Sequence, residues 1–284
     1  MPAHCEREPV GAGCFSGVML KTALILALIA TACGGNRGEG AATSGRTAWE
    51  DVSLVHVLDG DSLIVDTAGG EVEIRLSGVN APDRDECGHR EATARLAAMV
   101  DDARLAMAIE GTDQFGRTLG RLVADGSDVA LALVREGHGL AMTTAANSYE
   151  LLAAEDTAYA EGIGMWSPDF CGVGSLPHIR FDPGASVTDP AGRDDETLDA
   201  EVIVIVNRGG NAVDLTSWVL RDGSSRHRYR FGSGVMLRPG VSIQIDSADP
   251  GWSPGGGPVW SNDGDIALLL DSRGGIVARW RYDG

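Results

Sequence analysis

Lysine is almost absent from this chain of 284 residues, because Lys21 is the only one and every later cation is Arg or His. Acidic residues outnumber basic ones by 41 to 23, which gives a formal net charge of −18. This balance argues against a broad basic surface for duplex nucleic acid. It leaves phosphodiester chemistry open, because a local arginine pair and a metal ion suffice to neutralise one phosphate.

Aromatic residues are also scarce, at 5%, whereas glycine is abundant with 39 residues. Together with short alternating apolar runs, this composition favours β structure with many tight turns over a helical bundle. The length is sufficient for two modest domains, each with a core of its own.

The apolar run within Met19–Cys33 is too short to span a bilayer comfortably, and it follows a basic start in the manner of a signal peptide. We expect a lipoprotein acylated at Cys33, outside the cytoplasm and anchored to the membrane through that lipid, with residues 34–36 as the start of a tether. Ordinary cleavage after residues 30–32 and secretion is the alternative. The residues before Met19 are unusual ahead of a signal peptide and indicate an upstream start.

The cysteines leave one even pair for the mature protein. Cys5 and Cys14 precede Met19 and Cys33 is assigned to lipid, so Cys87 and Cys171 remain in an oxidising compartment. We predict a disulfide between them, which would contribute about 3 to 5 kcal/mol on the chain-entropy model. Two free thiols are the alternative, and a zinc site is disfavoured because the chain has no C-x-x-C pair.

Composition divides the chain into four parts: a signal segment at 1–33, a flexible tether at 34–48, and two domains at 49–173 and 174–284. In the first domain, a three-stranded meander followed by amphipathic helices and further strands predicts an OB-type barrel with helices. In the second, regular short strands, among them Asp214–Arg221, predict an immunoglobulin-like β-sandwich. The expected fold is therefore mainly β with some α.

Five residues of the first domain suit phosphodiester hydrolysis. Asp61 and Asn80 follow strands and offer the oxygen ligands that a hard divalent cation needs. Arg75 and Arg117 each present a guanidinium that can donate two parallel hydrogen bonds to a phosphate. Asp83 adds a carboxylate near a metal-held water. Taken singly, each is more often a turn, surface or loop residue.

In order and spacing these segments resemble the staphylococcal-nuclease-like (thermonuclease) family, whose pattern is D-G-D-[TS], then R-L-x-x-[VI]-[DN]-[TA]-P-E, then D-x-[YF]-G-R. The chain has DGDS at 59–62, RLSGVNAPD at 75–83 and DQFGR at 113–117. The resemblance implies hydrolysis of DNA or RNA with Ca²⁺ as cofactor. It implies calcium ligands at Asp61, Asn80 and the carbonyl of Ala81, phosphate contacts from Arg75 and Arg117, and a water-orienting base at Asp83.

Two positions depart from the family pattern. Asn80 stands where the best-known members have Asp, although Asn occurs there in relatives; it removes one negative charge and predicts weaker calcium binding. Asp83 stands where the family has Glu, so the carboxylate is one methylene shorter and catalysis is expected to be reduced. A catalytically weakened phosphate-binding module is therefore the alternative to a nuclease.

The strands from about His178 to Gly284 resemble a lamin-tail domain, whose ligand here is unknown. Five basic residues gather on one expected hairpin: Arg221, Arg226, His227, Arg228 and Arg230. They form either a solvated hairpin face or a patch that holds nucleic acid or an anionic polymer near the first domain. A role in envelope adhesion, with the barrel as a spacer, is the remaining alternative. We expect a monomer.

Overall fold

The computed structural model describes residues 48–113, 116–143, 145, 147–171, 178–192 and 198–283. The signal segment, Cys33, the tether up to residue 47 and the expected domain boundary at 174 lie outside the described residues. Residues 45–284 form one compact unit. None of the described helices is long and apolar enough to cross a membrane.

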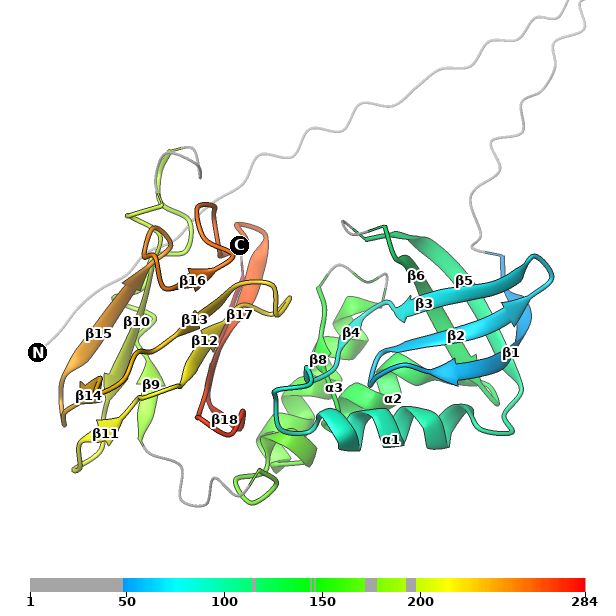
Figure 1. Cartoon of the computed structure of the whole chain (residues 1–284), viewed down its shortest axis with the longest axis horizontal. Helices are drawn as coiled ribbons and strands as arrows, with labels where there is room; N and C mark the ends of the chain where they lie inside the picture. Colours follow the sequence, from blue (N-terminus) through cyan, green and yellow to red (C-terminus); the bar gives the residue numbers. More distant parts are fainter. Residues whose placement is uncertain are drawn as a thin grey trace, which may run out of the picture. The chain divides into compact units, whose positions relative to one another are not determined.

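The first domain is a closed five-stranded barrel with three helices (Figure 1). Parallel pairing of β3 with β6 closes the sheet order β3-β2-β1-β5-β6, and the short β7 extends it beyond β6. The strands are β1 Glu50–Val57, β2 Ser62–Thr67, β3 Gly70–Leu76, β4 Val79–Asn80, β5 Leu105–Thr112, β6 Thr118–Ala124, β7 Ser127–Asp128 and β8 Leu140–Ala141. The helices are α1 His89–Val100, α2 Val129–Arg135 and α3 Ser148–Glu161, followed by a 3₁₀ turn at Gly164–Trp166.

Local sequence explains these elements. The β2–β3 hairpin turns at Ala68–Gly69, and Gly70 has a φ of 108°, which a residue with a side chain rarely adopts. Helix α2 begins after Asp128, whose side chain accepts a hydrogen bond from the Leu131 N–H at 3.0 Å. Helix α3 ends at Gly162 in the left-handed conformation. The barrel and helices share one apolar core that includes Leu63, Leu96 and Leu133.

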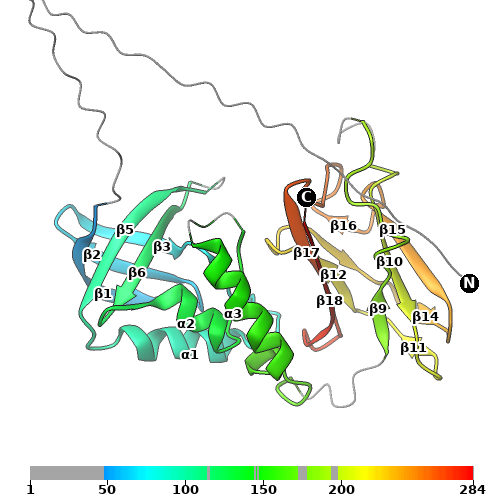
Figure 2. The ribbon, with the colours of Figure 1, turned by 180° about the vertical axis from the view of Figure 1, so that it is seen from behind.

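The second domain consists of two main β-sheets, consistent with the expected immunoglobulin-like sandwich (Figure 2). One sheet has the order β15-β10-β9 and the other β16-β13-β12-β17-β18, with a separate β11-β14 pair. The strands are β9 Ile179–Phe181, β10 Val202–Asn207, β11 Val213–Asp214, β12 Val219–Arg221, β13 Arg228–Arg230, β14 Met236–Leu237, β15 Ser242–Asp246, β16 Trp252–Ser253, β17 Gly264–Leu270 and β18 Ile276–Asp283. Trp218 and Trp260 are buried in its core.

One expected strand is wrong. The segment Asp214–Arg221 is broken into β11 and β12 by a turn. The Asp214 side chain accepts hydrogen bonds from both the N–H and the hydroxyl of Thr216, at 2.9 and 2.6 Å, and Ser217 has a φ of 65°. Such side-chain bonding to the local backbone competes with a strand ladder, and alternation of apolar residues does not reveal it.

Candidate functional site

A cavity of about 490 Å³ opens where the barrel strands end. It is lined by Asp59, Asp61, Arg75, Asn80, Ala81, Pro82, Asp83, Arg84, Asp85, His89, Arg117, Ser224, Ser225 and Arg226. All the metal-binding and catalytic residues expected from the sequence are therefore in one place. Strand register explains part of this, because Ser62 pairs with Arg75, and Ile74 pairs with Thr118, the neighbour of Arg117.

Asp61 is buried at the start of β2, and its carboxylate is held from several sides. One oxygen, Oδ2, accepts the Ala81 N–H at 2.7 Å, and the other accepts the Ser62 hydroxyl at 3.0 Å and forms an ion pair with Arg75. Gly60 permits this approach, because a Cβ there would lie 2.7 Å from the Cβ atoms of both Ala81 and Ala92. The glycine of the DGD segment thus lets the turn pack against the Ala81 loop.

Arg75 joins the two expected metal ligands. Its guanidinium pairs with Asp61 and donates from Nη2 to Asn80 Oδ1 at 2.5 Å. Burial, followed by the neighbouring charge of Arg117, lowers the pKa of Arg75 to about 10, so the side chain remains protonated at neutral pH. The oxygens of Asp61 and Asn80 are therefore arranged around one cationic group.

This donor set fits a hard cation. Asp61 and Asn80 offer a carboxylate and a carboxamide oxygen that both contact the Arg75 guanidinium, and oxygen-only ligands are those that calcium prefers. Within the described ranges no group of three or more His, Cys, Asp or Glu side chains could hold a metal ion. A calcium ion would depend on Asp61, Asn80, the Ala81 carbonyl and water, a set with a single carboxylate.

Arg117 reaches the cavity from the segment that precedes β6. Its N–H and Nε donate to Asp113 Oδ1 and Oδ2 at 2.9 and 2.7 Å, and the side chain is 41% exposed. Gln114 and Phe115 lie outside the described residues. Of the two arginines expected to contact phosphate, Arg75 is thus mostly buried and Arg117 is accessible, and together they are a suitable pair for a phosphate group.

Asp83 was expected to lie near a metal-held water, and in the structure it contacts an arginine of the second domain. Its Oδ2 accepts from Arg228 Nη2 at 2.6 Å, although the carboxylate is half exposed. Glu86, a nearby carboxylate of the same loop, is buried and paired with Arg221 and Arg228 at 2.7 Å each. Glu86 is therefore committed to the second domain and does not replace Asp83.

Two residues of the basic cluster of the second domain, Arg221 and Arg228, differ from both sequence interpretations, whereas Arg226 and Arg230 are exposed. Arg221 is 2% exposed and bound to Glu86, and Arg228 contacts Asp83 and Glu86, so neither belongs to a solvated face or to an open patch. Arg226, with Ser224 and Ser225, lines the cavity instead. These three residues were not predicted as part of the site. The complementary runs of charge at residues 83–86 and 226–230 are the feature of the sequence that could have indicated the contact.

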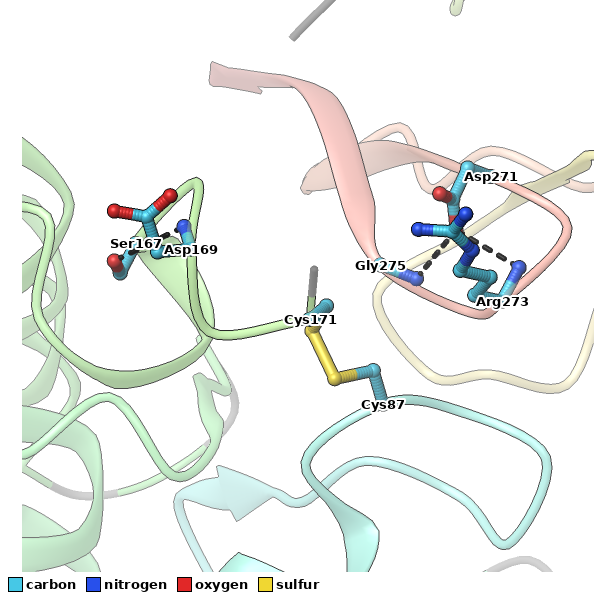
Figure 3. Close-up of a disulfide and its surroundings, with 7 residues drawn as sticks. All are labelled: Cys87, Ser167, Asp169, Cys171, Asp271, Arg273 and Gly275. Carbon is cyan, nitrogen blue, oxygen red and sulfur yellow. Dashed lines mark hydrogen bonds between the residues drawn. A yellow bond between two sulfur atoms is a disulfide. The ribbon is translucent and has the colours of Figure 1, made fainter. Parts of the chain in front are cut away.

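Cys87 and Cys171 form a disulfide with a Cα–Cα distance of 5.8 Å (Figure 3). It ties the loop after Asp83 to the end of the first domain. The turn Asp271–Gly275 of the second domain lies beside it, where the Gly274 carbonyl accepts the Cys87 N–H at 3.2 Å. The loop that contains Asp83 and Glu86 is thus fixed by a covalent bond and by the second domain.

Comparison with known families agrees with this arrangement. The family described as Staphylococcal nuclease homologue matches residues 73–168, and the Lamin Tail Domain family matches residues 185–284. The chain therefore combines a staphylococcal nuclease homologue domain with a lamin tail domain. Below, the two parts are called the nuclease-homologue domain and the lamin-tail domain.

Curated relatives match part of the chain at low identity. An "Uncharacterized endonuclease" of Haemophilus influenzae is 27% identical over 115 residues, which cover 40% of this chain and 65% of that protein. "Protein ParB" of Escherichia coli is 28% identical over 138 residues, with 42% and 75% covered. The "Micrococcal nuclease" of Shigella flexneri is 29% identical over 136 residues, with 42% and 76% covered. The chain thus spans less than two thirds of the first relative and about three quarters of the other two.

Proposed function

We propose that this protein is an exported, calcium-dependent nuclease that hydrolyses phosphodiester bonds of DNA, RNA or both. The main support is the meeting of Asp61, Arg75, Asn80, Asp83 and Arg117 in one cavity. Two relatives are named as endonuclease and micrococcal nuclease, which also supports the proposal. The cavity lining carries four arginines and four aspartates, so cationic groups for a phosphate and oxygen ligands for a cation lie close together.

The residues of the cavity have separable tasks in this proposal. Asp61, Asn80 and the Ala81 carbonyl hold calcium, which when bound supplies a Lewis acid that polarises the phosphate and its attacking water. Arg75 and Arg117 neutralise the charge that develops on the phosphate oxygens. Asp83 orients the attacking water and accepts its proton. The new P–O bond to the water oxygen forms as the bond to the departing sugar oxygen breaks.

The proposed location is outside the cytoplasm, with the chain anchored to a membrane through a lipid on Cys33. This proposal rests on the sequence pattern of residues 19–33, which lie outside the described residues. Radiolabelled palmitate incorporation that is lost in Cys33→Ser would support it, and release of the unmodified wild-type chain into the medium would contradict it.

Arg117→Ala is the variant that tests the nuclease activity most directly. Removing one guanidinium from the phosphate should lower cleavage about 10²- to 10³-fold. The measurement uses the chain from Gly34 onward on single-stranded DNA, duplex DNA and RNA, with calcium and with EDTA. Arg135→Ala, which removes an exposed arginine at the end of α2, is the matched control. A folded wild-type chain that cleaves none of these substrates would contradict the proposal.

A phosphate-binding module with weak turnover is the second candidate, and the shorter carboxylate of Asp83 in its contact with Arg228 favours it. Asp83→Glu restores the family residue and should raise kcat about tenfold if carboxylate reach limits the reaction. An unchanged, slow kcat in both proteins, with retained oligonucleotide binding, would favour the binding module.

A further inference from the structure

The carboxamide of Asn80 lies between the two domains. Its Nδ2 donates to the Gly223 carbonyl and to the Ser225 hydroxyl, each at 2.9 Å, whereas its Oδ1 accepts from Arg75 at 2.5 Å. The residue is 3% exposed, so each of these contacts is made away from water. If the amide were turned by 180°, its oxygen would face the Gly223 carbonyl oxygen, and its nitrogen would face the Arg75 guanidinium. The lamin-tail domain thus determines which atom of Asn80 faces the metal-binding side.

The segment that makes these contacts is the β12–β13 hairpin, residues 221–230, and it is held firmly. The Gly223 N–H donates to Asp265 Oδ1 at 3.1 Å, and a Cβ at this position would lie 2.7 Å from Ile266 Cγ2. At the hairpin's two strand ends, Arg221 and Arg228 pair with the buried Glu86 of the nuclease-homologue domain. The contact with Asn80 is therefore set by packing and by buried charge.

We infer that the β12–β13 hairpin of the lamin-tail domain is a working part of the nuclease site, because it keeps the Asn80 Oδ1 on the side of Arg75, where it would be available to calcium. This inference rests on the proposed function. Ser225 acts through Asn80 and is a positioning residue. The hairpin also reaches Asp83 through Arg228, so two residues of the proposed machinery depend on the lamin-tail domain.

The inference explains why Asn, and not Asp, stands at position 80. A carboxylate cannot donate a hydrogen bond to the Gly223 carbonyl, and its second oxygen would be repelled there at a distance of 2.9 Å. Simple charge counting predicts that Asn80→Asp binds calcium more tightly. The hairpin predicts the opposite, because the variant leaves two buried acceptors facing each other.

The test compares Ser225→Ala with Ser233→Ala, an exposed serine elsewhere in the lamin-tail domain, in the chain from Gly34 onward. Loss of one hydrogen bond to the amide should raise the calcium Kd about 3- to 10-fold, measured by isothermal titration calorimetry. Cleavage should fall at low calcium and return at saturating calcium. Urea unfolding in EDTA should be the same for Ser225→Ala and Ser233→Ala, which separates weaker calcium binding from a general loss of folding. Asn80→Asp should bind calcium no more tightly than the wild type.

Three results would overturn parts of this picture, and they are distinguishable. If the wild type binds calcium and cleaves while Ser225→Ala matches Ser233→Ala, the hairpin does not position Asn80. Tighter calcium binding by Asn80→Asp would also reject the role of the Gly223 carbonyl. A folded wild type that neither binds calcium nor cleaves would overturn the proposed function, and the inference with it.

Discussion

Two buried glutamates of the nuclease-homologue domain, Glu86 and Glu155, each receive two arginines from the lamin-tail domain. Glu86 pairs with Arg221 and Arg228, and Glu155 pairs with Arg279 and Arg281 at 2.5 and 2.8 Å. The chemistry is the same in both clusters, but the surroundings differ. Arg228 continues to Asp83 in the cavity, whereas Arg279 lies over the rings of Tyr159 and Trp166.

The two clusters have different roles in the contact between the domains. The Glu155 cluster adjoins an apolar group in which Met165 and Trp166 of the first domain pack with Ile266 and Leu268 of the second. Its contribution is to hold the domains together. The Glu86 cluster holds the hairpin whose residues line the cavity. A buried ion pair is weak evidence for net stability, so we regard the two clusters chiefly as fixing the relative placement of groups that apolar packing alone would leave less defined.

Arg228→Gln and Arg279→Gln form the matched pair that would break this comparison. In each variant the buried glutamate keeps its second arginine, so both should lose roughly 1 to 3 kcal/mol of unfolding free energy. Only Arg228→Gln should also lower kcat, about 3- to 10-fold, because it releases Asp83. Urea unfolding and steady-state cleavage at a temperature where both variants are folded provide the two measurements.

Two outcomes would contradict that separation. Equal effects on kcat would mean that the Glu86 cluster has no special relation to the cavity. A higher kcat in Arg228→Gln would mean that the guanidinium restrains Asp83, and that the lamin-tail domain suppresses the site.

The sequence predicts the cavity well because its residues belong to contiguous segments with fixed spacing. Asp61 follows a turn. Arg75 is the residue before the end of β3 and pairs with Ser62, the neighbour of Asp61, and Asn80 lies four residues after Leu76. Periodicity likewise predicts helices over about residues 89–101 and 149–161, and the structure has them as α1 at His89–Val100 and α3 at Ser148–Glu161. These features depend on residues that are close together in the sequence, so the spacing and periodicity of apolar residues predict them.

The contact between the domains could not be predicted in the same way. Glu86 and Arg221 are 135 residues apart, and Asn80 and Ser225 are 145 apart, so no local pattern links them. The prediction of an exposed hairpin was wrong for Arg221. A charged side chain is normally exposed, and Arg221 can be buried because it is paired with Glu86 of the other domain. Asn80 illustrates the consequence. From the sequence alone its amide indicates only a lost negative charge, whereas the structure shows that the amide nitrogen donates to the Gly223 carbonyl of the other domain.

Asp265 provides a smaller, pH-dependent test of how the hairpin is supported. Its Oδ1 accepts the N–H groups of Gly223 and Ile266 at 3.1 and 2.7 Å, and burial, followed by the neighbouring Asp222 charge, raises its pKa to about 6. Asp265 in turn helps to raise the pKa of Tyr282, after burial. Because the folded pKa lies above the unfolded value, the native state binds the proton more tightly. The stability that this tighter proton binding adds to the native state is fully present below about pH 4 and is lost as pH rises through 6.

Asp265→Asn should therefore be more stable than the wild type by about 1 to 2 kcal/mol at pH 7.5, with the gain disappearing near pH 4. The amide oxygen can still accept the Gly223 N–H, so the hairpin should keep its place and cleavage should be unchanged. Urea unfolding at pH 4, 6 and 7.5 measures the gain, and Asp263→Asn, which alters an exposed carboxylate two residues away, is the control. A variant less stable than the wild type at pH 7.5 would show that the Asp265 charge is needed to hold the hairpin, and the support of Asn80 would then be electrostatic as well as steric.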